Sequence, residues 1–257
     1  MDGKHIEAGG LRIFYRDEGQ GQPLVLLHGG LTTSDSWKGQ IEKLAEHYRV
    51  LAPDTRGHGG TDNPAGQLSY AQMADDVVAF CQALDIERPL IVGYSDGGQS
   101  ALEIGLRHPG FAKALVMGGT VSAPVESYLA GLRSWGFTRP GEADLVVMEQ
   151  AFGGFFEVIK ASHSAVYGPD YWRDYLKQIS TLWLGLPTYS AEQLATITDP
   201  ALVIMGDRDE LGGVDAAARL FKGIGKGELS IIANADHSAV NTGLFWDAVG
   251  EFLARQV

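Results

Sequence analysis

Short apolar runs alternate with amphipathic segments along most of the chain. Continuous apolar runs are typical of strands buried on both faces, and apolar residues three and four positions apart indicate helices. The pattern predicts strands over 24–27, 50–52, 90–92, 114–117, 201–205 and 229–232. It predicts helices over about 36–48, 69–84, 97–108, 214–221 and 244–255. Residues 6–8 and 11–16 flank Gly9-Gly10, which indicates an N-terminal hairpin.

Strands that alternate with helices of about a dozen residues predict an α/β fold with a parallel sheet covered on both faces. The alternation stops over about 121–189, a helical segment that holds 12 of the 24 aromatic residues. We therefore predict a single domain over 1–257, with a core of 1–120 and 190–257 and a helical cap insertion of about 121–189. The aromatic residues suggest that this insertion shapes an apolar pocket.

Composition narrows the classes of partner. Of the 257 residues 45% are hydrophobic and 20% charged, which is ordinary for a globular enzyme, and the net charge of −12 argues against nucleic acid or an anionic membrane as partner. The one cysteine, Cys81, lies in a helical pattern as a core residue and excludes a disulfide within the chain. With no apolar run near ~18 residues and no signal-peptide core, we expect a cytoplasmic location. The sequence does not predict the oligomeric state.

The clearest chemical signal is Gly93-Tyr-Ser-Asp-Gly97, between a predicted strand and a predicted helix. Strand and helix approach closely in such a turn, so only glycine fits at Gly93 and Gly97, and the apical Ser95 adopts a strained backbone conformation. The turn exposes the Ser95 hydroxyl, and the Asp96 N–H at the helix N-terminus points toward the same place. Ser95 is therefore the candidate nucleophile.

A serine nucleophile needs a base, and the base needs an acid to orient it. His237 follows the last predicted strand, and Asp207, Asp209 and Glu210 follow the strand before it. We predict His237 as the base and Asp209 as the acid, because Asp209 ends a Gly-x-x-Asp turn directed back toward the strand ends. A calcium loop would need a glutamate at Ala218, so we predict no metal and no cofactor. Neither glycine-rich stretch matches a nucleotide-binding motif.

Residues 28–30, His-Gly-Gly, follow the first apolar run and could approach a substrate closely. We predict the Gly30 N–H as the second oxyanion donor beside that of Asp96, with the Leu31 N–H as the alternative. We expect His28 to form local hydrogen bonds. The loop that carries His58 is expected to be a structural turn, with Asp54 and Arg56 paired locally.

Together these segments resemble the α/β-hydrolase superfamily along nearly the whole chain. The matching motifs are His28-Gly29-Gly30 with Trp37 downstream, Asp54-x-Arg56-Gly57-x-Gly59, Gly93-Tyr-Ser-Asp-Gly-Gly98, Gly206-x-x-Asp209 and His237. The resemblance implies the α/β-hydrolase fold, a mostly parallel, doubly wound, eight-stranded sheet with a helical cap. It also implies Ser95 as nucleophile, Asp209 as acid, His237 as base, and Gly30 and Asp96 as amide donors.

Within the superfamily, Ser95-Asp-Gly-Gly98 and Tyr167-Gly-x-x-Tyr171 look like the valacyclovir hydrolase-like (biphenyl hydrolase-like) esterases. In that group the acidic residue after the nucleophile can contact a substrate amine, a role that would fall to the Asp96 side chain here. The alternative is that Asp96 caps the helix. Asp236 stands where many relatives have glycine, and its charge would raise the pKa of His237 if the two lie close.

From these residues we predict a serine hydrolase that cleaves small to medium, partly apolar carboxylic esters. Leu31, Tyr94 and Trp135 are the expected substrate contacts. The alternatives are a C–C bond hydrolase acting on meta-cleavage products, a lactonase, or a slow-turnover ligand receptor of the same fold. The known C–C hydrolases carry a H-G-x-G-P-G loop, which the 28–32 segment lacks.

Overall fold

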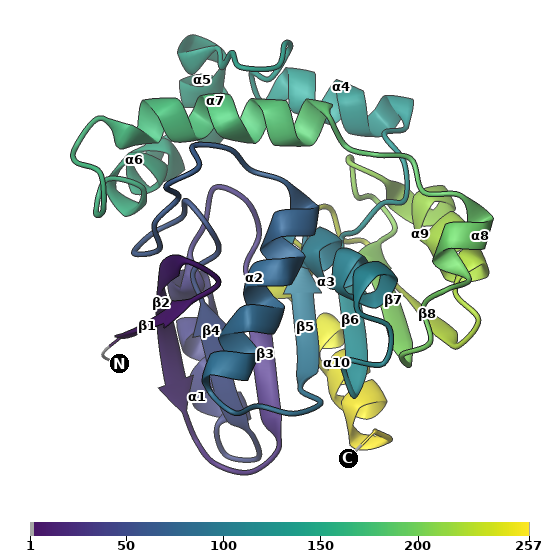
Figure 1. Cartoon of the computed structure of the whole chain (residues 1–257). Helices are drawn as coiled ribbons and strands as arrows, with labels where there is room; N and C mark the ends of the chain where they lie inside the picture. Colours follow the sequence, from purple (N-terminus) through teal and green to yellow (C-terminus); the bar gives the residue numbers. More distant parts are fainter. Residues whose placement is uncertain (1–2, 257) are drawn as a thin grey trace.

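The computed structural model describes residues 3–256, and one mixed sheet organises them (Figure 1). Its eight strands are β1 (Lys4–Ala8), β2 (Leu11–Glu18), β3 (Pro23–Leu27), β4 (Arg49–Pro53), β5 (Leu90–Tyr94), β6 (Ala114–Gly118), β7 (Ala201–Gly206) and β8 (Gly227–Ile232). Their order is β1-β2-β4-β3-β5-β6-β7-β8. The β1–β2 and β2–β4 pairs are antiparallel, and the other pairs are parallel. The predicted mostly parallel, eight-stranded α/β-hydrolase sheet is thereby confirmed.

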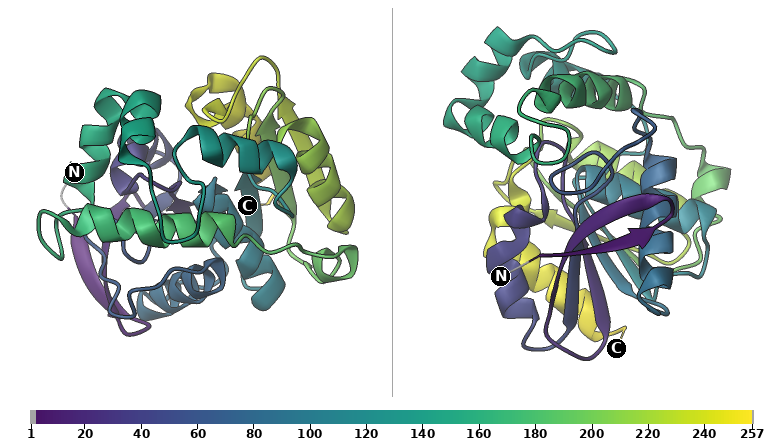
Figure 2. Two further views of the ribbon diagram at one scale, coloured as in Figure 1. Left: turned by 90° about the horizontal axis from the view of Figure 1, so that it is seen from above. Right: turned by 60° about the vertical axis from the view of Figure 1, so that its left-hand side comes forward.

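Helices cover both faces of this sheet because each buried strand sends alternate side chains to opposite sides. On β3, Val25 and Leu27 belong to the core beneath α2 (Tyr70–Ala83), α3 (Asp96–Arg107) and α9 (Gly213–Gly223). Leu24 and Leu26 belong to the opposite core, beneath α1 (Lys38–Leu44) and α10 (Gly243–Ala254). Figure 2 shows these two layers on either side of the sheet. Cys81 is fully buried in the first core.

The segment predicted as a helical insertion contains no strand among its described residues. It forms α4 (Glu126–Ser134), α5 (Leu145–Phe152), α6 (Gly154–Ser162) and α7 (Tyr171–Leu184), which we call the cap helices. They lie together across one edge of the sheet, with α7 running along it (Figures 1 and 2). The cap helices therefore cover the edge of the sheet at which the parallel strands end.

Two local predictions differ from the structure. The helix expected over 36–48 is a 3-10 turn at Ser34–Trp37 followed by the short α1, and the chain then turns into β4 at Arg49. A short helix, α8 (Ala191–Leu194), was not predicted, although Ser190 and Gln193 form the capping box that opens it. None of the helices within residues 3–256 has the length and apolar composition needed to cross a membrane.

Candidate active site

Ser95 stands at the apex of a sharp turn between β5 and α3. Its φ of 54° and ψ of −116° lie outside the regions that L-residues favour. A Cβ on Gly93 would lie 2.1 Å from the Gly97 carbonyl oxygen, and a Cβ on Gly97 would lie 2.0 Å from that of Leu27. Both contacts are impossible for a larger residue, so the glycine spacing permits the turn. The strained turn holds the Ser95 hydroxyl away from the backbone.

His237 comes from the loop that follows β8, and Asp209 comes from the loop that follows β7. His237 contacts Ser95, and Asp209 contacts His237. Nε2 of His237 lies 3.0 Å from Oγ of Ser95, and Nδ1 lies 2.9 Å from Oδ2 of Asp209. The Asp209 side chain has no exposed surface, and its second oxygen accepts the Leu211 N–H at 2.9 Å. The structure thus brings the three residues singled out from the sequence into one hydrogen-bonded chain.

The three acidic candidates after β7 have different hydrogen-bond partners. Asp207 accepts the backbone N–H of Ala235 at 3.2 Å, and Glu210 accepts the backbone N–H of His237 at 3.2 Å. Only Asp209 contacts the imidazole of His237 with its carboxylate. Asp209 is therefore the one of these three that can fix the tautomer of that ring.

The charge environment of His237 favours the protonated ring. Burial by itself lowers the pKa of His237, but the carboxylates of Asp209, Glu210 and Asp96 outweigh burial and leave it raised. Asp236, the residue expected from the sequence to raise this pKa, is exposed and accepts hydrogen bonds from the N–H and hydroxyl of Ser238. The main electrostatic partner of His237 is Asp209.

Two backbone amides flank Ser95. Within residues 3–256 neither the Gly30 nor the Asp96 N–H donates to another protein group. A Cβ on Gly30 would lie 2.5 Å from both Oδ2 of Asp96 and Cζ2 of Trp183, so only glycine fits there. The alternative donor, the N–H of Leu31, is occupied because it donates to the Tyr175 hydroxyl at 2.9 Å. Gly30 and Asp96 therefore stay the predicted donors to a substrate oxygen.

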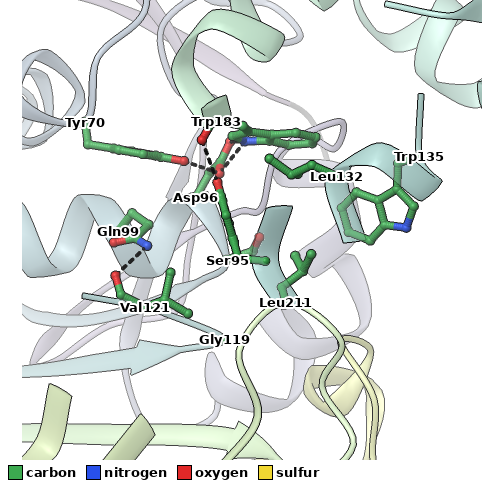
Figure 3. A pocket seen from close by; sticks show the side chains of 11 residues that line it. Tyr70, Ser95, Asp96, Gln99, Gly119, Val121, Leu132, Trp135, Trp183 and Leu211 are labelled. Carbon is green, nitrogen blue, oxygen red and sulfur yellow. Dashed lines mark hydrogen bonds between the residues drawn. The ribbon is translucent and has the colours of Figure 1, made fainter. Parts of the chain in front are cut away.

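The Asp96 side chain is buried next to Ser95, between Tyr70 and Trp183 (Figure 3). Oδ1 accepts hydrogen bonds from the Tyr70 hydroxyl and the Trp183 Nε1–H, both at 2.8 Å, and Oδ2 lies 3.0 Å from the same indole nitrogen. Burial raises the pKa of Asp96 to about 6, although these hydrogen bonds and His237 act to lower it. The carboxylate bonds to α2 and α7 and does not cap its own helix. A contact between Asp96 and a substrate amine stays a prediction.

The neighbouring histidines have structural surroundings. His28 is buried, with Nδ1 at 2.8 Å from the Gly29 carbonyl oxygen and Nε2 accepting the Thr55 N–H at 3.0 Å, the local bonding expected from the sequence. His58 is also buried, and burial holds its pKa well below the usual value. Both rings lie in the interior, with their centroids 5.0 Å apart.

The predicted local pairing of Asp54 and Arg56 is wrong. Arg56 forms a bidentate ion pair with Asp76 of α2, with its Nη2 at 2.7 Å and its Nε at 2.8 Å from the two carboxylate oxygens. Asp54 instead accepts the backbone N–H groups of Ser34 and Gly60, at 2.7 and 2.9 Å. Arg56 therefore anchors its loop to α2, while Asp54 joins two loops at the sheet edge.

Two cavities meet at Ser95. The outer cavity, about 470 Å³, opens to solvent and includes the predicted contacts Leu31, Tyr94 and Trp135 in its lining. The inner cavity is a slot of about 20 Å³, and Ser95, Trp135 and Trp183 line both cavities (Figure 3). Neither lining contains a lysine or arginine among the described residues. Residues 3–256 contain no group of three or more His, Cys, Asp or Glu side chains arranged to hold a metal ion.

Sequence reasoning missed the site residues supplied by the helix α7. Tyr175 and Trp183 lie eight residues apart on α7 and contact, respectively, the Leu31 N–H and the Asp96 carboxylate. The only available signal was aromatic residues at helical spacing, which is also the signal of an ordinary packed helix. Sequence spacing could not tell which of these aromatic residues face the site.

Comparisons with known proteins agree with this fold. A family model described as the alpha/beta hydrolase fold matches residues 22–243. The chain is 28% identical to a 2-hydroxy-6-oxo-6-(2'-aminophenyl)hexa-2,4-dienoic acid hydrolase of Metapseudomonas resinovorans, over 98% of this chain and 91% of the other. A solved meta-cleavage product hydrolase of Pseudomonas fluorescens superposes with a TM-score of 0.80 at 27% identity, covering 99% of this chain and 98% of that one.

A third relative is named for a different substrate. A solved N-acyl homoserine lactone degrading enzyme matches with a TM-score of 0.73 at 26% identity, over 97% of this chain and all of the other (100%). The comparisons therefore support the broad family resemblance. They favour meta-cleavage product hydrolases as named relatives over the narrower valacyclovir hydrolase-like group.

Proposed function

Because the chain belongs to the alpha/beta hydrolase fold family, we propose that it is a serine hydrolase that forms an acyl-enzyme on Ser95. One observation carries the proposal: the unbroken chain of hydrogen bonds from Asp209 through His237 to Ser95, with distances of 2.9 and 3.0 Å. These distances suit proton transfer between a nucleophile, a base and an orienting acid.

In this mechanism the Ser95 oxygen attacks the substrate carbonyl carbon, and Nε2 of His237 takes the hydroxyl proton. The N–H groups of Gly30 and Asp96 stabilise the oxyanion of the tetrahedral intermediate. His237 then passes the proton to the leaving group as the bond to it breaks. A water molecule, deprotonated by His237, attacks the acyl-enzyme and releases the acid, and the proton returns to Ser95. Asp209 keeps the ring in the tautomer that this sequence needs.

For the bond cleaved, we propose the ester bond, lactones included. A dienoic acid, the substrate class named for one relative, is an anion at neutral pH. The residues that line the two cavities offer no lysine or arginine to balance that charge, and they include the carboxylates of Asp96, Glu210 and Asp236. An uncharged ester suits this lining better than an anionic dienoate does.

C–C bond hydrolysis is the second candidate, and the comparisons favour it over ester hydrolysis. Two of the relatives above are named for it, with 27% and 28% identity over nearly the whole chain. The same three residues could serve it, since the serine attacks a ketone carbonyl in place of an ester carbonyl. The 28–32 segment, His-Gly-Gly-Leu-Thr, departs from the H-G-x-G-P-G loop of the known C–C hydrolases.

One set of assays separates these candidates. Parent enzyme and Ser95→Ala are compared on p-nitrophenyl esters, a lactone and a vinylogous dienoate, together with active-site titration. We expect ester or lactone turnover that falls at least ~10³-fold in Ser95→Ala, while circular dichroism shows an unchanged fold. Turnover of the dienoate alone would establish the second candidate. A ligand-induced rise in Tm with negligible hydrolysis of every compound would instead indicate a receptor.

The proposal places the enzyme in the cytoplasm, acting on a small molecule. It is supported by the single buried cysteine, which forms no disulfide, and by the net charge of −12, which disfavours nucleic acid and anionic membranes as partners.

A further inference from the structure

The two cavities at Ser95 differ greatly in size. The outer cavity offers about 470 Å³ and opens to solvent between the cap helices and the loops after β3 and β8. The inner slot offers about 20 Å³, which is room for about one water molecule. A substrate whose carbonyl carbon lies at Ser95 can place one half in each cavity, because Ser95 lines both.

The position of His237 decides which half goes where. His237 lines the outer cavity together with its neighbours Asp236 and Ser238, and it is not part of the inner lining. The base that deprotonates Ser95 must later protonate the leaving alcohol, so the alcohol half has to lie on the His237 side. The acyl half then extends into the inner slot.

We propose that this enzyme selects esters of short acyl chains, acetyl or propionyl, with large and largely apolar alcohols. This inference rests on the proposed function. The inner slot accepts little beyond a methyl or ethyl group, whereas Phe152, Phe155 and Val240 give the outer cavity apolar surface for an alcohol of aromatic size. The slot therefore limits the length of the acyl chain. The larger outer cavity accepts a wider range of alcohols.

The polar walls of the slot are held in place by hydrogen bonds. Tyr70 and Trp183 fix the Asp96 carboxylate, and the Gln99 side-chain amide donates to the Val121 carbonyl oxygen at 2.9 Å (Figure 3). The Tyr128 hydroxyl donates to the Trp183 carbonyl oxygen at 3.1 Å, which ties α4 to α7. Widening the slot on these sides would leave buried polar groups unpaired, which is costly.

Two leucine side chains form part of the apolar wall of the slot, together with Val121 and Trp135. The leucines are Leu132 of the helix α4 and Leu211 of the loop after β7, only 1% and 5% exposed. Leu211 packs tightly under α4, since a Cβ on Gly131 would lie 2.5 Å from its Cδ2. Replacing either leucine by alanine removes part of the apolar lining and breaks no hydrogen bond. We therefore expect each substitution to enlarge the slot.

A pair of isomeric esters gives the sharpest test, because it exchanges the two halves and keeps the leaving-group chemistry similar. The compounds are 2-phenylethyl acetate and methyl 3-phenylpropanoate, with hydrolysis followed by pH-stat. We expect kcat/KM for the acetate to exceed that for the phenylpropanoate at least ~10-fold, as a missing or extra methylene in a fitted pocket commonly achieves. Equal or reversed values in the parent enzyme would overturn the inference.

Substitutions in the lining of the slot test whether the slot causes the preference for short acyl chains. With p-nitrophenyl esters from acetate to octanoate, the parent should prefer the shortest chains, and Leu132→Ala and Leu211→Ala should each move the optimum to longer ones. Leu244→Ala, at a leucine 59% exposed on α10, is the matched control and should keep the parent profile. Using two leucines guards against one variant failing to fold, which the Tm reports.

The outcome also distinguishes the inference from the proposed function. A flat chain-length profile that still vanishes in Ser95→Ala would overturn the short-acyl inference and leave the serine mechanism standing. Absence of hydrolysis for every ester, with no acyl-enzyme by mass spectrometry, would overturn both.

Discussion

The hydroxyl of Tyr175, on the cap helix α7, accepts a hydrogen bond from the backbone N–H of Leu31 at 2.9 Å. Leu31 has a φ of 61° and follows Gly30, the proposed oxyanion donor. The Tyr175 ring is fully buried and stacks on His163 of the same cap, with centroids 3.9 Å apart. The cap therefore fixes the loop that carries one of the two proposed oxyanion donors.

We expect Tyr175→Phe to lower kcat about tenfold and to change KM little, because the Gly30 N–H loses its fixed direction but keeps its place. Losing an oxyanion donor outright costs ~10²–10³ in kcat, so an indirect effect should be smaller. The matched control is Tyr167→Phe, which removes a hydroxyl that accepts the Asn63 N–H at 2.6 Å, away from this loop. A rise in KM at unchanged kcat would show that Tyr175 does not position the donor.

Asp209→Asn should reduce kcat/KM by about 10³–10⁴-fold at neutral pH. An asparagine amide beside Nδ1 favours the tautomer in which Nε2 carries the proton and cannot accept another from Ser95. Asp207→Asn is the matched control, since the asparagine oxygen can still accept the Ala235 N–H. We expect that variant to stay within a few-fold of the parent. The reverse ranking in steady-state assays would assign the acid to Asp207.

The pH profile should show the raised pKa of His237. The ring must be neutral to accept a proton, so kcat/KM falls as the pH drops through that pKa, which lies above the ordinary 6.5. Glu210→Gln removes one of the charges that raise the pKa and preserves an acceptor for the His237 N–H. We expect its acidic limb to move to lower pH.

The control for this shift is Glu192→Gln on α8, an exposed carboxylate far along the chain from the His237 loop, which should keep the parent limb. A limb that stays fixed in Glu210→Gln, or moves to higher pH, contradicts the electrostatic account. Both variants are compared at one ionic strength because salt screens these charges.

Gly97→Ala should destabilise the fold by about 1–3 kcal/mol or more, because the added methyl group would lie 2.0 Å from the Leu27 carbonyl oxygen. Gly250→Ala in α10 is the control: nothing lies within 4 Å of its Cβ position, so alanine should add about 0.5–1 kcal/mol of stability. Thermal unfolding followed by circular dichroism measures both. A Gly97→Ala protein with the parent Tm would mean that β3 and α3 have room to separate.

The sheet and its two helical layers follow from local sequence. Apolar runs such as Leu24–Leu27 can be buried on both faces only in a covered sheet, and Gly93 and Gly97 permit one kind of turn around Ser95. Less could be predicted where several local structures cost similar energy. The short helix at 38–44 and the capped α8 are of that kind, and element boundaries depend on the neighbours that pack there.

The amino-acid sequence by itself determined the candidate nucleophile, base and acid, because each follows a strand and the ends of parallel strands meet at one edge. Only the tertiary structure decided that Arg56 pairs with Asp76, that Tyr175 binds the Leu31 N–H, and that Leu132 and Leu211 line the slot beside Ser95. These contacts join segments far apart along the chain. Their energies depend on burial and distance in three dimensions, which no local pattern encodes.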